Sequence, residues 1–190
     1  MVKSLLVAAA MIVSVAAQAH NTLGESIFAS QMPSIKQMVV TEGIDWKVGD
    51  ESNYKLNIGG FLNGTMKMYV KSIGADGIWL AQEMNLQIQK QTMEMLLDPN
   101  TGEIKKVLVD GKEQQLPKSD PQIVDSRQEQ VTVPAGTFDS FWIKIQDKAN
   151  NNEESQQWVN PQQIPLSGMI KAIQNSQIGK VTIELTSFKK

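Results

Sequence analysis

The sequence predicts a mainly β protein, built as a single curved antiparallel sheet or half-barrel with meander connections and a short N-terminal helix. After Gly43, apolar residues recur at every second position, which is the period of a half-buried strand. Turn-forming residues interrupt this pattern about every 8 to 12 positions, as in antiparallel sheets. The length of 190 residues suits one domain with a substantial core. These observations divide the chain into residues 1–19, 20–42 and 43–190.

Residues 1–19 have the features of a secretory signal peptide. Lys3 supplies the positive charge, and Leu5–Ala16 supplies the apolar region. Small residues at Ala17 and Ala19 suit cleavage by a signal peptidase after either position. The apolar run is shorter than the ~20 residues that cross a bilayer, and no stop-transfer sequence follows it, which disfavours the alternative of an uncleaved anchor. We therefore expect a periplasmic or secreted protein that is soluble after cleavage.

Residues 20–42 are expected to form a helical segment ahead of the sheet. Leu23, Ile27 and Ile35 belong to a set of apolar residues spaced at three or four positions, as on one face of an amphipathic helix. Pro33 interrupts this pattern. We expect the segment to pack on the sheet or to cover it as a lid.

Short turn sequences set the expected strand register. Asn63-Gly64 predicts a type I′ hairpin turn between strands near residues 54–62 and 65–73. Ala75-Asp76-Gly77 suits a three-residue hairpin loop, and Gln89-Lys90 is taken as a further tight turn.

This register gathers methionines on one face of the sheet. It places Met68 opposite Met84 and Leu86 opposite Met93, and a bulge at Gly59-Gly60 is expected to bring the preceding strand into phase. Methionine lines surfaces that adapt to varied apolar partners, but it also fills ordinary cores, and thioether copper binding is a third interpretation. The candidate ligand-binding residues are Met66, Met68, Met84, Leu86, Met93 and Met95.

Further turns and strands continue to the C-terminus. Hairpin turns are expected at Asp98–Gly102 and Asp110-Gly111, a surface connection at Pro117–Pro121, and a solvated loop at Lys148–Glu154. The later strands are expected at Ile123–Val133, Phe138–Gln146, Ser155–Val159, Met169–Gln174 and Val181–Phe188.

Composition excludes several classes of chemistry. The chain has no Cys, so it has no disulfide, thiolate metal site or cysteine nucleophile. Its one histidine, His20, cannot complete a Ser-His-Asp triad near a mobile terminus. The balance of 18 basic and 20 acidic residues, with Arg127 as the one arginine, argues against nucleic-acid binding. We expect no catalytic residues, no metal site and no cofactor.

Three motifs carry a resemblance to a known family. Trp46-Lys47-Val48-Gly49-Asp50, Val133-Pro134-Ala135-Gly136-Thr137-Phe138, and Trp158-Val159-Asn160-Pro161 with Gly168-Met169-Ile170-Lys171 resemble a family of exported bacterial domains of unknown function. That family is distantly similar to the periplasmic lipoprotein carriers LolA and LolB. The resemblance implies a curved sheet that holds acyl chains under a helical lid.

These features favour a non-enzymatic periplasmic binding or carrier protein that holds a lipid, acyl chain or peptide on the concave face of the sheet. A lipid or a lipoprotein is the expected partner. The alternative is a structural or protein-interaction module of the cell envelope without a small ligand. The sequence leaves the oligomeric state open.

Overall fold

A computed structural model describes residues 45–190, apart from residues 88, 116–119, 150 and 177–178. The expected signal peptide and N-terminal helix lie outside the described residues, as does most of the connection expected near Pro117. The described residues form strands and contain no helix. The strands are β1 (Glu51–Ile58), β2 (Leu62–Gly74), β3 (Gly77–Leu86), β4 (Gln89–Leu97), β5 (Ile104–Val109), β6 (Lys112–Gln114), β7 (Pro121–Val133), β8 (Gly136–Asp147), β9 (Glu153–Val159), β10 (Met169–Ser176) and β11 (Gly179–Lys189).

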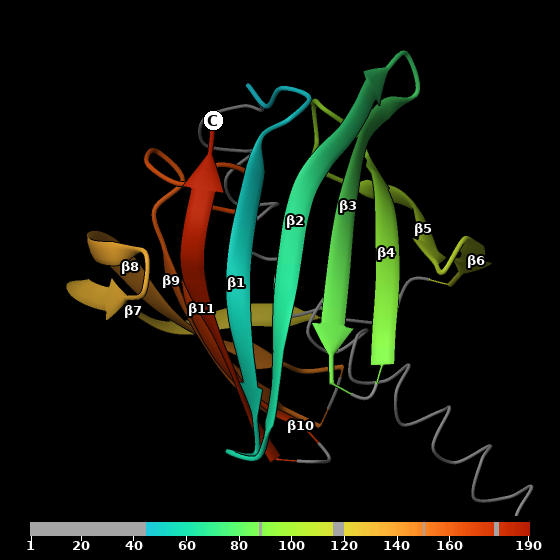
Figure 1. Cartoon of the computed structure of the whole chain (residues 1–190). Coiled ribbons are helices and arrows are strands. Elements are labelled where there is room, and N and C mark those ends of the chain that lie inside the picture. The colour runs from blue at the N-terminus through green and yellow to red at the C-terminus, as the bar shows by residue number, and fades with distance from the viewer. Residues whose placement is uncertain (1–44, 88, 116–119, 150, 177–178) are drawn as a thin grey trace, which may run out of the picture.

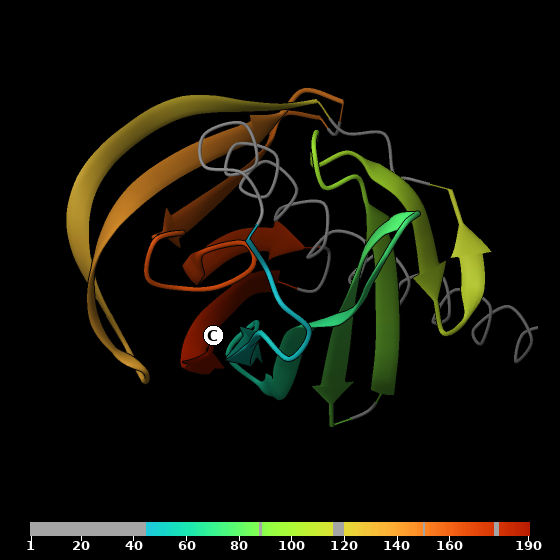
Figure 2. The same cartoon turned by 90° about the horizontal axis from the view of Figure 1, so that it is seen from above.

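All eleven strands belong to one open antiparallel sheet in the order β6-β5-β4-β3-β2-β1-β11-β10-β9-β8-β7 (Figure 1). Seen from above, the sheet curls until β7 and β8 lie across the interior from β3 to β5 (Figure 2). The tip of the β7–β8 hairpin returns to β11, where the Ala135 N–H donates to the Leu185 carbonyl at 3.1 Å. The predicted mainly β fold with a single curved sheet is therefore confirmed.

The first hairpin turn was predicted at the wrong place. Ile58 pairs with Leu62, so the turn is made by residues 59–61, and Asn63-Gly64 lies inside β2. Gly59 and Gly60 have φ values of 62° and 80°, which two successive glycines adopt without steric cost. This loop also makes the expected bulge at Gly59-Gly60 unnecessary.

Moving the turn restores the alternation of β1. Tyr54 pairs with Met66, and Leu56 and Ile58 lie on the same face as Tyr54. All three β1 side chains are buried. The apparent mismatch between the apolar face of β1 and the methionine face of β2 therefore came from the wrong turn. A three-residue loop in place of the predicted two-residue turn shifts every following side chain by one position.

The registers of β2 with β3 and of β3 with β4 also differ from prediction, but each side chain still lies on the face of the sheet that was predicted for it. Met66 pairs with Met84 instead of Leu86, because the β2–β3 turn has two residues and β2 has a bulge after Val70. Leu86 pairs with Gln89 instead of Met93, since Gln89 and Lys90 belong to β4 and not to a turn. Both offsets are even, so alternate side chains stay on the expected face.

The turns and strands predicted after β4 are confirmed, whereas Glu153 and Glu154, expected in a loop, belong to β9, and Pro121, expected in a connection, begins β7. The Asp98–Gly102 segment turns with the Gly102 N–H donating to the Asp98 carbonyl at 2.9 Å. Asp110-Gly111 forms a hairpin turn with positive φ at both residues, and Pro134-Ala135 forms the turn between β7 and β8. Each of the five later strand predictions falls within β7 to β11.

Gly64 lies inside β2, where the close approach of β3 leaves little room for a side chain. A Cβ at this position would lie 2.7 Å from the Asn85 carbonyl oxygen and 2.6 Å from Leu86 Cδ2 on the neighbouring strand. Replacing Gly64 with alanine should therefore force β2 and β3 apart and lower the free energy of unfolding by about 1–3 kcal/mol. Urea denaturation measures this change.

Thr65→Ala is the matched control, because Thr65 is the exposed next residue of the same strand. Its effect should stay within about 1 kcal/mol. Equal effects of the two substitutions would contradict the close approach at Gly64.

Candidate apolar ligand site

The six predicted site residues share one face of β2, β3 and β4 and belong to one continuous hydrophobic cluster. We call the side of β1 to β5 that carries them the interior face. Their side chains are almost completely buried, with relative exposures of 1% for Met66, 0% for Met68, 6% for Met84, 5% for Leu86, 2% for Met93 and 0% for Met95. The shared face and its burial are confirmed, and their role in ligand binding stays a prediction.

One cross-strand row of the interior face mixes apolar and polar side chains. Ser52 on β1 pairs with Met68 on β2, and Met68 pairs with Gln82 on β3. Gln82 in turn pairs with Met93 on β4, which pairs with Val109 on β5. Two polar side chains therefore flank Met68 within the methionine cluster.

Three oxygens of this interior are short of hydrogen-bond partners among the described residues. Gln82 Oε1 has none, and Ser52 Oγ and Ser167 Oγ have the Tyr54 hydroxyl, whose pKa they lower by hydrogen bonding. The three residues are 1%, 0% and 1% exposed. A buried polar atom without a partner typically costs about 1–3 kcal/mol, so the fold bears such a penalty for keeping the Gln82 amide inside.

The Tyr54 side chain connects the interior face to the start of β10 by a hydrogen bond. Its hydroxyl donates to the Met169 carbonyl at 3.1 Å. Burial raises the pKa of Tyr54 to about 12, although the nearby Ser52 and Ser167 side chains lower this pKa in part. Tyr54 is therefore a neutral hydrogen-bond donor throughout the physiological pH range.

The segment of residues 160–168 reaches into the interior (Figure 2). Ile164 and Leu166 are both fully buried in the hydrophobic cluster. Leu166 adopts a φ of 65°, an uncommon conformation for a large side chain that costs energy. Gly168 closes the segment, and its N–H and carbonyl bind Pro165 and Asn160. Pro161 and Pro165 lie in this segment and suit its irregular backbone, because proline cannot donate a hydrogen bond to a strand ladder.

The sequence analysis missed Ser52, Tyr54, Gln82 and the buried segment. Gln82 carried a signal, since it is a polar residue at an alternate position of a strand that is otherwise apolar on that face. Ser52 and Tyr54 could not be placed, because the wrong turn assignment put their strand out of phase.

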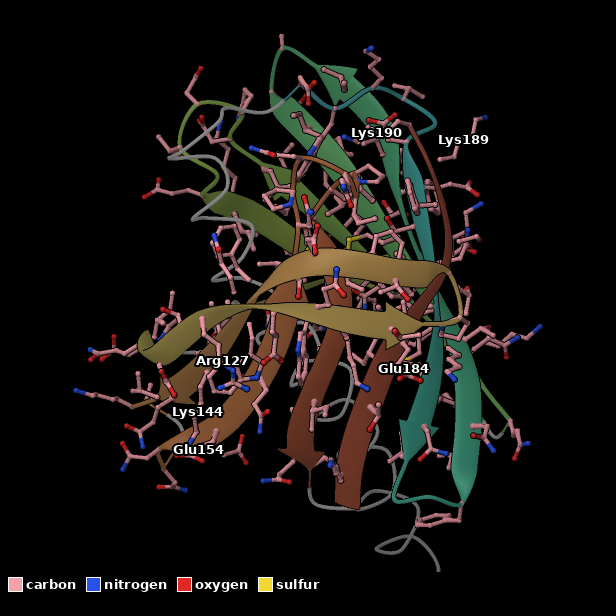
Figure 3. The ribbon with its side chains drawn as sticks, turned by 90° about the vertical axis from the view of Figure 1, so that its left-hand side faces the viewer. Arg127, Lys144, Glu154, Glu184, Lys189 and Lys190 are labelled. Carbon is pink, nitrogen blue, oxygen red and sulfur yellow. The ribbon has the colours of Figure 1, made fainter. Side chains whose placement is uncertain are left out.

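A second group of interactions crosses the outer side of the sheet (Figure 3). The Arg127 guanidinium stacks 3.6 Å above the Trp142 ring, and its Nε lies 2.6 Å from Glu129 Oε2. Trp158 Nε1 donates to Glu129 Oε1 at 2.6 Å. Lys171 lies 5.7 Å from the centre of the Trp158 ring.

The same chain of contacts continues to β1. Lys171 pairs with Glu184 at 3.0 Å, and Glu184 pairs with Lys55 at 2.8 Å. Because these side chains pair with one another, the network links β7 and β8 to β9, β10, β11 and β1 on the outer side of the sheet. Arg127, the one arginine of the chain, therefore has internal partners in Trp142 and Glu129.

Among the described residues, no group of three or more His, Asp or Glu side chains is placed to hold a metal ion. The same part of the chain contains no helix of the length and apolar character needed to cross a membrane.

The burial of Met84 leads to a direct test. Met84→Lys places an unpaired charge at a position that is 6% exposed, so we expect a loss of more than about 3 kcal/mol in the free energy of unfolding. Met84→Leu, which nearly preserves volume, should cost less than about 1.5 kcal/mol. A loss below about 1 kcal/mol for the lysine variant would show that solvent reaches this part of the interior face.

The Glu129 contacts predict an acid-dependent loss of stability. The hydrogen bond from Trp158, followed by that from Arg127, lowers the pKa of Glu129 from its usual 4.5. Its contribution is therefore complete above the pKa of the unfolded chain and disappears as the pH falls through the lower folded value. Urea denaturation of wild type and Glu129→Gln at pH values from about 7 to 3 should show a smaller acid-induced loss in the variant. Identical pH profiles would contradict this role.

Comparison with known proteins establishes no family. No protein-family model matches the chain, and no curated protein matches its sequence. Solved structures with partial similarity include a Bacteroides fragilis protein described as exported and as having a YmcC-like fold. It is 10% identical, with 78% of this chain and 99% of that chain covered and a TM-score of 0.43.

A Parabacteroides distasonis protein described as a lipoprotein is 14% identical over 77% of this chain and 97% of that chain, with a TM-score of 0.39. MucB is 7% identical over 84% of this chain and 57% of that chain, with a TM-score of 0.41. The family resemblance in the three motifs therefore gains no family match, and similarities of this size do not assign a function.

Proposed function

We propose that this protein is a non-enzymatic periplasmic carrier that holds an apolar ligand, such as a lipid or an acyl chain, against the interior face of the curled sheet. The observation that carries the proposal is the composition of that face. Five methionines lie together with buried serine hydroxyls and with a glutamine oxygen that has no partner among the described residues. A core selected for stability alone would favour branched aliphatic side chains and exclude such oxygens.

Methionine suits a face that must alternate between two packing arrangements. Its side chain has three rotatable bonds and a polarisable sulfur, so it fills irregular space and tolerates a change of neighbour. Met68 and Met95 are fully buried. A ligand that displaced part of the interior packing would therefore meet side chains able to rearrange around it.

The charge distribution supports an uncharged binding surface. Glu51 pairs with Lys67 at 2.8 Å, and Glu94 pairs with Lys71 at 2.7 Å, on the side of the sheet opposite the methionines. Asp50 is the one charged side chain among the buried described residues, and it accepts a hydrogen bond from the Lys47 N–H. An interior of this kind suits binding of an apolar chain better than acid–base catalysis.

Export is the other part of the proposal. It rests on the signal-peptide pattern of residues 1–19 and on the motif resemblance to exported domains. A lipoprotein or a membrane lipid would be the source of the ligand in that compartment.

A specific observation also favours the alternative of a protein-interaction module. Ile123 and Val124 on the edge strand β7 are each 49% exposed, and Phe141 on β8 is 52% exposed. Exposed apolar residues on an edge hairpin are typical of surfaces that contact another protein. In this alternative, the interior face is a core and the hairpin is the functional surface.

Native mass spectrometry separates the two functions. The protein is expressed from its full sequence, purified without detergent and examined before and after organic extraction. A carrier should show adducts of acyl species that extraction removes. A mass without adducts, together with exclusion of an apolar dye, would contradict the carrier and support the interaction module.

The control is Phe61→Ser, which removes a phenylalanine side chain that is 71% exposed. This variant should retain the acyl species, since Phe61 lies in the β1–β2 loop outside the interior face. Their loss in Phe61→Ser would show that lipid adheres to exposed aromatic residues.

A further inference from the structure

Gln82 is the least expected residue of the interior face. It is 1% exposed, and its Oε1 has no hydrogen-bond partner among the described residues. Its neighbours across the strands are Met68 on one side and Met93 on the other. A leucine or methionine would fill this position without the cost of a buried unpaired amide oxygen.

Ser52 presents a second oxygen on the far side of Met68. It is fully buried and lies in the same cross-strand row. Its hydroxyl hydrogen-bonds with the Tyr54 hydroxyl and lowers the pKa of Tyr54, and a serine oxygen has two acceptor lone pairs, so it can accept a further hydrogen bond. Since neighbouring strands lie about 4.8 Å apart, the backbones that carry Ser52 and Gln82 are separated by about 10 Å. Met68 lies between the two residues in this row, so a small polar group placed over Met68 would have both as neighbours.

The chemistry of these two groups defines what they would recognise. An amide oxygen accepts hydrogen bonds only, and a serine hydroxyl accepts or donates one. Neither carries a charge, and the one charged side chain among the buried described residues, Asp50, is an acid two positions before Ser52. A carboxylate or phosphate would find no cation here, whereas a hydroxyl group would find an acceptor.

We propose that the ligand is an uncharged amphipathic lipid whose hydroxyl-bearing polar group binds over Met68, donating a hydrogen bond to Gln82 Oε1 and bonding to Ser52 Oγ. The acyl chain then lies along the methionines of β2, β3 and β4. This inference rests on the proposed carrier function, and it adds the class of the ligand and the two residues that select it. It also explains why the fold retains polar oxygens that reduce its stability.

Two esters with the same acyl chain test the proposal. Monooleoylglycerol has two hydroxyl groups, and methyl oleate has none. Each ester is titrated into the delipidated protein, and its affinity is measured by displacement of a fluorescent naphthylamine probe. Wild type should prefer monooleoylglycerol by about tenfold, which corresponds to one additional hydrogen bond.

Gln82→Met should reduce this preference to about twofold or less, because the thioether cannot replace the amide oxygen as an acceptor. Removal of an unpaired amide should also raise the Tm by about 2–4 °C. Ser52→Ala is a second variant of small volume change and should reduce the preference as well. Gln91→Met is the matched control: Gln91 lies on the same sheet face and has no orphaned side-chain atom, so the preference should persist.

The outcomes distinguish the two proposals. Equal affinity of wild type for the two esters, or a preference that survives in Gln82→Met, would overturn the assignment of Gln82 and leave the carrier function standing. Failure of wild type to bind either ester would overturn the carrier function and this inference with it.

Discussion

Leu80, Met68 and Met95 lie on one face of neighbouring strands and are fully buried, and the rest of the structure depends on this burial. A flat sheet would leave such a face open to water. Curling brings β7 and β8 across the interior, and the segment of residues 160–168 places Ile164 and Leu166 against the same cluster. The strained φ of Leu166 and the return of the β7–β8 tip to β11 follow from the need to cover this face.

The covered interior contains buried polar groups that lower the stability of the fold. Gln82 has an amide oxygen without a partner among the described residues, and the buried Ser52 and Ser167 hydroxyls have the Tyr54 hydroxyl as their partner. The outer side shows the opposite behaviour, since Arg127 and Glu184 are joined to the neighbouring strands by paired contacts. Paired polar groups outside and a buried, unpaired amide oxygen inside are the combination that the proposed carrier function leads us to expect.

The sequence predicted the sheet, most of its strands and the face that carries the methionines. That success came from the two-residue period, which survives any even error in register, such as those at Met66 and Leu86. The first turn was misplaced because Asn63-Gly64 and Gly59-Gly60 are both plausible turn sequences. The broken alternation of β1 was the local sign of the error, and the structure adds the close approach of Asn85 and Leu86 to Gly64.

The interior polar groups and the outer network could not be predicted from the sequence, for a different reason. They join residues distant in the chain, as Tyr54 to Met169 and Glu129 to Trp158 do. Such contacts depend on how far the sheet curls, and local patterns do not encode this curvature. The orphaned oxygen of Gln82 had a local signal, the interruption of an apolar alternation, but its meaning required the neighbouring strands.

The central claim is that the interior face is both the core of the fold and the surface that receives the ligand. NMR of protein labelled with ¹³C at the methionine methyl groups tests it most directly, because each buried thioether reports separately. Our account predicts a contact between the methyl groups of Met66 and Met84, which pair directly across β2 and β3, and shifts of the Met68, Met84 and Met93 signals when monooleoylglycerol is added. Signals of these methyl groups that stay unchanged while the lipid binds elsewhere would contradict it.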